Sequence, residues 1–209
     1  ASSARTRRSA RSRRGPERAA AAMASPRYDD ALLRRVVKTV FAQVAAEGVD
    51  GASMRKVAAA TQLSTGTLNY HFGNKQGLLV AALDYAYRAP RDWERDLADP
   101  RAALGRLLAR YVLDRASIRT WWRFWCAVTA HAPRDPELAR RQEENQAALL
   151  GFFTEALSHG VTRGAFFVAE PRVEAEAMVA LGYGVALRQL IDESPLATAR
   201  ARALLDAAV

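Results

Sequence analysis

The sequence predicts an all-α protein with a small N-terminal helical unit and a larger C-terminal helical domain. Apolar residues recur at the spacing of helix faces along most of the 209 residues, half of which are apolar. No stretch alternates apolar and polar residues for long enough to form a sheet. The length is sufficient for one large domain or two small ones, with a substantial buried core.

The first predicted helix covers 29–47, where six apolar residues recur at helical spacing: Leu32, Leu33, Val36, Val40, Phe41 and Val44. Gly48 is suited to end it, because glycine accepts the left-handed backbone that often follows a helix. Ser53 should cap a short second helix, "MRKVAAA", and Ser64 a third that reaches about Phe72. The residues "TQL" form the turn between the second and third helices.

A fourth helix should begin at Lys75 after the cap Asn74 and end near Arg88. Five more helices are predicted, at about 101–117, 118–131, 136–159, 172–193 and 196–208. The stretches "APRDP", "RGAFFVAEP" and "ESP" are the connecting loops.

The net charge of +9 lies entirely in the N-terminal third of the chain. Residues 1–22 hold seven arginines and one glutamate, and residues 23–75 hold seven basic and four acidic side chains. From Gln76 onward, seventeen basic and seventeen acidic residues cancel. A basic excess confined to one part of a chain is typical of a nucleic-acid-binding site.

We expect residues 1–26 to form a disordered basic tail, because Ser, Arg and Ala recur there without hydrophobic periodicity. The tail has no apolar segment of the kind found in secretory signals. Met23 could be the natural start, which would make the first 22 residues extraneous. Alternatively, the arginines form an arm that binds phosphates without sequence preference.

Two short helices joined by a three-residue turn, after a longer helix, form the layout of a helix-turn-helix. A helix this short is marginal alone, so Leu63, Leu68 and Phe72 must dock the third helix on a core. Gly66 lies in its first turn, where glycine weakens a helix by up to about 1 kcal/mol relative to alanine. The absence of a side chain would let this helix N-terminus approach another backbone closely. The alternative is a tolerated surface glycine with no role.

The stretch "VAAATQLSTGTLNYHFGNKQGLL" closely resembles the DNA-binding signature of TetR-family transcriptional repressors. The residues that fit this signature are Val57, Ala58, Ser64, Gly66, Leu68, His71, Phe72, Lys75 and Leu78. The chain departs from the signature at Thr61, where the family has alanine, at Gln62, where it usually has glycine, and at Asn69, where tyrosine is commonest.

The resemblance implies that the third helix enters the major groove of double-stranded DNA. Thr65, Thr67 and Tyr70 would then contact base edges or methyl groups, because hydroxyls can pair with either base type. The residues implied to hold phosphates are Ser53, Arg55, Asn69, His71 and Lys75. Ser64 and Gly66, at the N-terminus of the third helix, are the remaining DNA-binding candidates. His71 could instead be a hydrogen-bonded structural histidine.

The C-terminal part concentrates three tryptophans in "YVLDRASIRTWWRFWCAVTAHA". Trp121, Phe124, Trp125 and Val128 are predicted to share one helix face, with Trp122, Cys126 and Thr129 on another, so this helix should be central to its domain. Simple core packing explains such a pattern, and so does a ligand cavity lined by aromatic rings. The candidate ligand-binding residues are Tyr111, Trp121, Trp122, Trp125 and Cys126.

The stretch "RTWWRFWCAVTAHAPRDPELARRQEENQAALLGFFTEAL" resembles the effector domain of BetI-type regulators within the same family. Those regulators respond to choline. The resemblance therefore implies a small-molecule effector, with a quaternary ammonium compound such as choline as one hypothesis, since aromatic faces attract such cations.

Several other classes of function find no support in the sequence. No phosphate-binding loop, zinc-type Cys/His spacing or H-E-x-x-H pair is present, so we predict no enzyme, metal or cofactor. No apolar run is long enough for a transmembrane helix. The single cysteine, Cys126, is interpreted as a buried small hydrophobe and suits a reducing cytoplasm.

The predicted helix 172–193 carries a stripe that should pair with a second copy of the chain: Ala177, Ala180, Leu181, Gly184, Leu187 and Ile191. Gly182 and Gly184 would let another helix come close. We therefore expect a helix-turn-helix DNA-binding domain at 27–75 and a ligand-binding and dimerisation domain at 76–209. The expected function is that of a homodimeric, ligand-released repressor of a palindromic operator. The alternative is an architectural protein that binds DNA without sequence preference through its arginine-rich tail.

Overall fold

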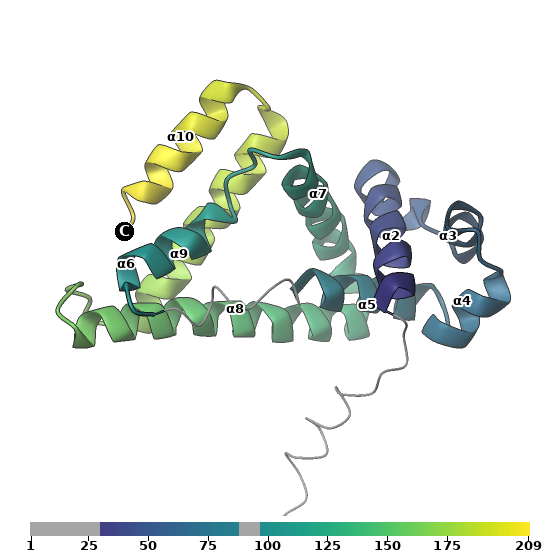
Figure 1. The fold of residues 1–209 in the computed structure, drawn as a ribbon, viewed down its shortest axis with the longest axis horizontal. Helices are drawn as coiled ribbons and strands as arrows, with labels where there is room; N and C mark the ends of the chain where they lie inside the picture. The colour runs from purple at the N-terminus through teal and green to yellow at the C-terminus, as the bar shows by residue number, and fades with distance from the viewer. Residues whose placement is uncertain (1–29, 88–96) are drawn as a thin grey trace, which may run out of the picture.

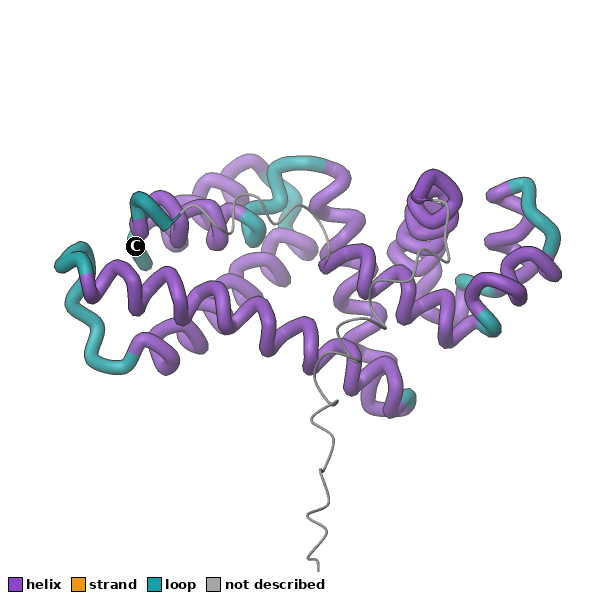
Figure 2. The backbone as a smooth tube through the Cα atoms, turned by 60° about the horizontal axis from the view of Figure 1, so that its bottom comes forward, coloured by secondary structure: helices purple, strands orange, loops and turns teal. Residues whose placement is uncertain are grey.

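The structure is a computed structural model that describes residues 30–87 and 97–209. Within these residues all regular structure is helical, as the sequence predicted (Figure 2). The elements are α2 (Asp30–Gly51), α3 (Met54–Thr61), α4 (Thr65–Phe72), α5 (Lys75–Tyr87), α6 (Pro100–Ala109), α7 (Ala116–His131), the 3-10 helix η2 (Ala132–Arg134), α8 (Pro136–Thr162), α9 (Pro171–Ile191) and α10 (Pro195–Asp206). The predicted basic tail, 1–26, lies outside the described residues.

The N-terminal helices begin and end where local sequence signals place them. The Ser53 side chain accepts a hydrogen bond from the backbone N–H of Lys56 at 3.2 Å, which caps α3. Asn74 accepts from the N–H of Gly77 at 2.9 Å at the start of α5. Gly48 interrupts α2 with a φ of 74°, so the regular helix stops there as expected.

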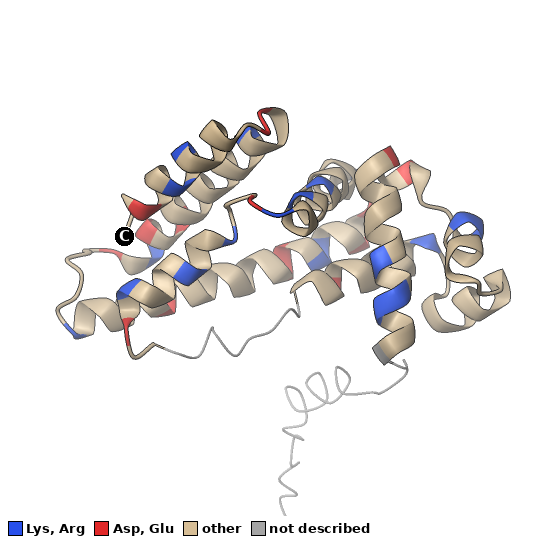
Figure 3. Ribbon diagram, turned by 45° about the horizontal axis from the view of Figure 1, so that its top comes forward, with Lys and Arg blue, Asp and Glu red and all other residues tan. Residues whose placement is uncertain are grey.

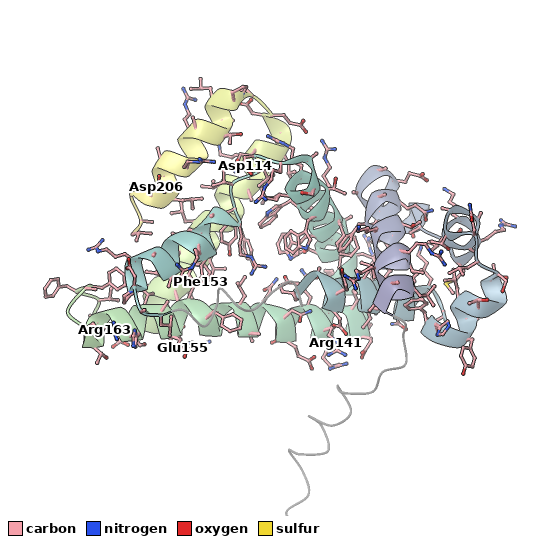
Figure 4. The ribbon with its side chains drawn as sticks, viewed as in Figure 1. Asp114, Arg141, Phe153, Glu155, Arg163 and Asp206 are labelled. Carbon is pink, nitrogen blue, oxygen red and sulfur yellow. The ribbon has the colours of Figure 1, made fainter. Side chains whose placement is uncertain are left out.

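The described residues pack around two hydrophobic cores. The N-terminal core joins α2, α3, α4 and α5, and it contains four buried residues of α5: Leu78, Leu79, Ala82 and Leu83. This core therefore extends past residue 75, the boundary predicted for the DNA-binding domain. The C-terminal core joins α6, α7, α8, α9 and α10, with Phe153 of α8 fully buried inside it (Figure 4).

Helix α7 belongs to both cores and lies between α2 and the C-terminal helices (Figure 1). Phe124 and Val128 pack in the N-terminal core, and the Phe124 ring meets the Phe41 ring of α2 edge-on at 4.2 Å. Trp122 and Trp125 pack in the C-terminal core. The single face predicted for Trp121, Phe124, Trp125 and Val128 is therefore divided between two cores, because neighbouring residues on a helix point about 100° apart.

Helix α8 runs along the molecule and connects its two parts (Figure 1). At its N-terminus the cap Asp135 accepts hydrogen bonds from the N–H of Leu138 and, at 2.7 Å, from the side chain of Gln76 in α5. One turn further along, Arg141 forms an ion pair with Asp84 of α5 at 3.1 Å (Figure 4). These contacts fasten α5, the helix that follows the two short helices, to the C-terminal part of the molecule.

The predicted helix 101–117 is wrong in its second half, because α6 ends at Ala109 and an irregular segment runs to Arg115. Gln189 of α9, which is 1% exposed, replaces the missing helical hydrogen bonds of this segment. Its side chain accepts from the N–H of Leu113 at 2.9 Å and donates to the carbonyl of Tyr111 at 2.8 Å. The Trp122 indole donates to the carbonyl of Arg110 at 3.2 Å. Buried backbone groups need such partners, so contacts distant in sequence stabilise the break in the helix.

Candidate DNA-binding surface and effector cavity

Helix α4 is docked by two buried side chains and presents an uncharged face to solvent. Leu68 is 0% exposed and Phe72 is 7% exposed, as the docking argument requires. Thr65, Gly66 and Asn69 are exposed, and the ring of Tyr70 is 86% exposed. The helix carries no Lys, Arg, Asp or Glu, whereas α2 and α3 beside it carry basic side chains (Figure 3).

The first turn of α4 holds two hydroxyls close together. Ser64 caps the helix by accepting from the N–H of Thr67 at 2.9 Å, and the two side-chain oxygens also lie 2.9 Å apart. One hydroxyl donates to the other, so one hydrogen of the pair remains to donate outward. Thr67 is half-buried, which leaves Thr65 and Tyr70 as the more accessible of the three candidates for reading bases.

Nothing within the described chain requires a glycine at position 66. A Cβ atom built there would meet only the Ser64 hydroxyl oxygen, at an ordinary contact distance of 3.5 Å. Gly77 is different, because a Cβ atom there would lie 2.0 Å from the carbonyl oxygen of Phe72. The packing inside the chain therefore explains Gly77 but does not explain Gly66.

The basic candidates surround the helix-turn-helix. Arg55 is exposed on α3. Lys75 Nζ lies 3.5 Å from a carboxylate oxygen of Asp50, whose side chain is 94% exposed. A contact of this length with a solvated carboxylate contributes little, so a phosphate can compete for Lys75. His71 is half-buried, and its ring centroid lies 5.1 Å from that of Tyr70.

A cavity of about 510 Å³ lies in the C-terminal domain, between the ends of α5 and α6, the irregular segment after α6, and helices α7, α8 and α9. This volume is in the range of small-molecule sites. Tyr111, Trp121 and Trp122 line the cavity, whereas Trp125 and Cys126 are not among its lining residues. Trp125 lies behind it, where its indole N–H donates to the Tyr87 hydroxyl at 3.1 Å.

Several lining residues were not predicted from the sequence: Tyr87, Arg106, Arg110, Arg115 and Tyr183. They come from four separate segments, and no local motif marks any of them. Tyr183 adjoins Gly184 on a helix that was interpreted only as a dimer surface. Its position beside that stripe is the one signal that could have identified it, since a wide apolar face on a helix indicates contact on two sides.

The tyrosines around the cavity are neutral hydrogen-bonding groups. Burial raises the pKa of Tyr111, of Tyr183 and of Tyr87 above the ordinary value of a phenol. Among the described residues, the buried hydroxyl of Tyr111 has no hydrogen-bond partner. A protonated phenol in this position can donate to an acceptor on a bound molecule.

Gly182 has a role different from the one predicted for it. A Cβ atom there would lie 2.7 Å from the ring of Tyr111, so this glycine makes room for a side chain of its own chain. At Gly184, by contrast, a Cβ atom would meet nothing within 4 Å. Of these two glycines, only Gly184 is therefore open to contact with a second copy of the chain.

The predicted dimer stripe is exposed along its whole length: Ala177, Ala180, Leu181, Gly184, Leu187 and Ile191. Ile191 is 89% exposed, and the neighbouring helix α10 adds Leu196 at 59% and Leu204 at 53%. In Figure 1, α9 and α10 lie on the side of the molecule away from α3 and α4. Large apolar side chains left exposed on two neighbouring helices are typical of an interaction site.

The fold and these two sites define a helix-turn-helix regulator with a separate helical domain that contains a cavity. Two sequence families match this chain: "Bacterial regulatory proteins, tetR family" over residues 39–82, and "BetI-type transcriptional repressor, C-terminal" over residues 100–209. The chain belongs to the TetR family of transcriptional regulators and has a BetI-type C-terminal domain. These matches confirm both resemblances seen in the sequence.

Individual relatives agree with this assignment. The regulator BetI of Paraburkholderia xenovorans is 28% identical over 160 residues, which cover 72% of this chain and 77% of that protein. A TetR-family regulator from Rhodococcus sp. has the same fold, with a TM-score of 0.76, 27% identity, and coverage of 86% of this chain and 97% of the other. A transcriptional regulator from Saccharomonospora viridis, solved in complex with choline, gives a TM-score of 0.75 at 20% identity, covering 86% and 95% of the two chains. In the part of this chain that the structure describes, no helix has the length and apolar character needed to cross a bilayer.

Proposed function

We propose that this regulator is a cytoplasmic repressor that binds a palindromic operator as a homodimer and is released by a small molecule. The observation that carries the proposal is the surface of α4. It is exposed and uncharged, it bears hydroxyl, amide and phenol groups, and it has a glycine that packing within the chain does not require. Such a helix can lie against DNA, with its side chains on base edges and its N-terminus near a phosphate.

The roles of individual residues follow from their positions. We propose that Thr65 and Tyr70 contact bases directly, with Thr67 contributing through the hydroxyl pair at the helix cap. Arg55 and Lys75 would contact phosphates, which fix the position of the protein on the duplex without reading its sequence. We assign the DNA-binding role to the unit formed by α2 to α4, and effector binding to the end of α5 and the helices that follow it.

The homodimer would form through α9 and α10. Their exposed apolar side chains would be buried against the same surface of a second copy, giving a four-helix interface with two-fold symmetry. Two-fold symmetry would place two copies of α4 on the two halves of a palindrome.

Effector binding would act on DNA binding through α5 and α7. Helix α5 begins at Lys75, beside the DNA-binding surface, and ends at Tyr87, which lines the cavity. Helix α7 contributes Trp121 and Trp122 to the cavity and Phe124 to the N-terminal core. A ligand that binds one arrangement of these helices more tightly than another would shift the spacing of the two α4 helices.

The choline bound in the S. viridis regulator makes a quaternary ammonium compound one candidate effector for this chain. The aromatic lining of the cavity favours such a cation, because indole and phenol faces attract it.

The experiment that tests this function is selection of binding sites from random double-stranded DNA, followed by titration of the selected site. We expect an inverted repeat and a dimeric complex. The same titration with a chain lacking residues 1–22 separates this proposal from an architectural protein that binds through its arginine tail. Loss of most binding on truncation, together with no enriched sequence, would favour the architectural protein.

A further inference from the structure

Helix α9 exposes an apolar row in which steps of four and three residues alternate: Val173, Ala177, Ala180, Gly184, Leu187 and Ile191. Val173, which is 62% exposed, extends the predicted dimer stripe by one turn toward the start of the helix. A row with this spacing stays on one side of a helix that packs at a small angle against another helix. On the opposite side of α9, Ala175, Val185 and Ala186 are buried, so the row faces away from the C-terminal core.

The row is complementary to itself when a second copy of α9 runs in the opposite direction. A two-fold rotation about a point between Ala180 and Gly184 brings each of these residues opposite the other in the second copy. The same rotation places two further pairs opposite each other: Val173 with Ile191, and Ala177 with Leu187. The small residues at the centre let the two backbones approach closely, and a Cβ atom at Gly184 would meet nothing within 4 Å of its own chain.

Two charged residues beside the row favour this direction over the reverse one. Leu181, which is 37% exposed, lies beside the centre of the row. Glu174 precedes it by seven residues and Arg188 follows it by seven, so the three lie along one edge of the row. In the antiparallel arrangement Glu174 lies beside the partner's Arg188, whereas a parallel arrangement places like charges beside each other. Opposite charges attract across an interface and like charges are costly, so the antiparallel arrangement is favoured.

Glu174 and Arg188 are available for contacts with a second copy. Both are exposed, and neither forms an ion pair within the described chain. They are fourteen residues apart, or about 21 Å along the helix, so they cannot pair with each other in one chain. Other charges at the two ends of α9 are already engaged. Arg172 pairs with Glu176 at 3.3 Å, and Asp192 accepts a hydrogen bond at 3.0 Å from the backbone N–H two residues further on.

We infer that α9 packs antiparallel against α9 of a second copy, with the two-fold axis between Ala180 and Gly184 and a Glu174–Arg188 ion pair on either side of it. This inference rests on the proposed homodimer and adds which helices meet, in which direction and in which register. Because the ion pairs are exposed, they determine direction and partner more than affinity. The surface is thereby selective for a second copy of this chain, since an apolar helix without the matching charges would leave Glu174 and Arg188 unpaired.

The first test reverses one charge at a time in the full chain. Glu174→Arg and Arg188→Glu each place two pairs of like charges across their own homodimer, so each variant should dimerise at least about tenfold more weakly than the parent in sedimentation equilibrium. A mixture of the two variants restores both pairs of opposite charges in the heterodimer alone. Native mass spectrometry should therefore find more heterodimer than random association gives. Arg172→Glu mixed with Glu176→Arg is the matched control and should show no such excess, because these two residues pair within one chain.

The second test measures the register by cross-linking. The half-buried Cys126 is first replaced by alanine, so that only the introduced cysteine reacts. Leu181→Cys should then be joined to its own copy by a short bifunctional maleimide, because Leu181 lies at the axis. Val173→Cys should not, because antiparallel packing places the two copies of Val173 about 27 Å apart.

The possible outcomes separate this inference from the homodimer on which it rests. Weaker dimers in both reversed variants without an excess of heterodimer overturn the inference, and so do reversed variants as dimeric as the parent. Cross-linking of Val173→Cys, or none of Leu181→Cys, overturns it as well. Each of these results leaves the homodimer itself in place. A parent chain that sediments as a monomer would instead refute the proposed homodimer.

Discussion

The indole N–H of Trp125 donates a hydrogen bond to the hydroxyl of Tyr87, with 3.1 Å between nitrogen and oxygen. Tyr87 is the last residue of α5, and Trp125 lies in the middle of α7. This bond joins the helix that starts at the proposed DNA-binding surface to the helix that packs in both cores. It lies directly behind the cavity, because Tyr87 also lines that space.

Removing the acceptor of this bond should weaken the connection between the two helices. Tyr87→Phe leaves the Trp125 N–H buried without its partner, so the free energy of unfolding should fall by about 1–2 kcal/mol. Urea denaturation measures this change, with Tyr85→Phe on the same helix as the control. If both variants lose the same stability, or neither loses any, the bond between Tyr87 and Trp125 does not stabilise the junction.

The break between α6 and α7 should depend on Gln189. Gln189→Leu removes an acceptor for the N–H of Leu113 and a donor to the carbonyl of Tyr111, both buried. Each unsatisfied group costs about 1–3 kcal/mol, so the variant should lose about 2–4 kcal/mol of stability in denaturant titration. Arg188→Ala, one residue earlier and exposed, should stay within about 0.5 kcal/mol of the parent. A Gln189→Leu variant as stable as the parent would mean that water or another group satisfies the segment.

Helix positions and caps were predictable because their causes are local. Ser53, Ser64 and Asn74 cap the helices that follow them, and the signature residues of α4 are spaced as the family pattern requires. The break after Ala109 was not predictable, because its hydrogen-bond partner, Gln189, is 76 residues from Leu113 in sequence.

The candidate cavity was only partly predictable for the same reason. The tryptophans of α7 form a visible local cluster, but Tyr87 and Arg106 reach the cavity through tertiary packing. Gly182 could be recognised as a site of close approach from its place in a helix. Sequence alone could not show that the approaching group is the ring of Tyr111.

The turn of the helix-turn-helix contains a residue in a costly conformation. Gln62 has φ 57° and ψ 33°, the left-handed region, and it stands where the family usually has glycine. Gln62→Gly removes the steric cost of the Cβ atom, which exceeds the entropy lost by fixing a glycine, so stability should rise by about 0.5–1 kcal/mol. Thermal unfolding measures the change, and Gln62→Ala, which keeps the Cβ atom, should show no gain. A gain in the alanine variant and none in the glycine variant would contradict this explanation.

The proposed dimer surface can be tested at Gly184, where an added Cβ atom meets nothing within 4 Å in its own chain. Gly184→Arg should therefore fold, but it should be monomeric in light scattering and bind operator DNA at least about tenfold more weakly. Gly151→Arg is the control, because that helical glycine on α8 is also exposed with no neighbour within 4 Å of a Cβ atom. A Gly184→Arg protein that remains dimeric would remove this surface from the proposed assembly.

The central claim is that α4 lies against DNA closely enough to require a glycine at position 66. The most direct measurement is operator affinity at fixed salt for Gly66→Leu, with circular dichroism and thermal unfolding on the same sample. A Cβ atom at position 66 meets only an ordinary contact within the chain, and leucine favours a helix, so stability should be unchanged or raised by up to about 1 kcal/mol. Operator affinity should nevertheless fall at least about 30-fold, or about 2 kcal/mol, because the side chain would hold the helix away from the duplex. Gly151→Leu makes the same change on an exposed helix of the C-terminal domain and should bind as the parent does. A folded Gly66→Leu protein that binds the operator as tightly as the parent would contradict the account.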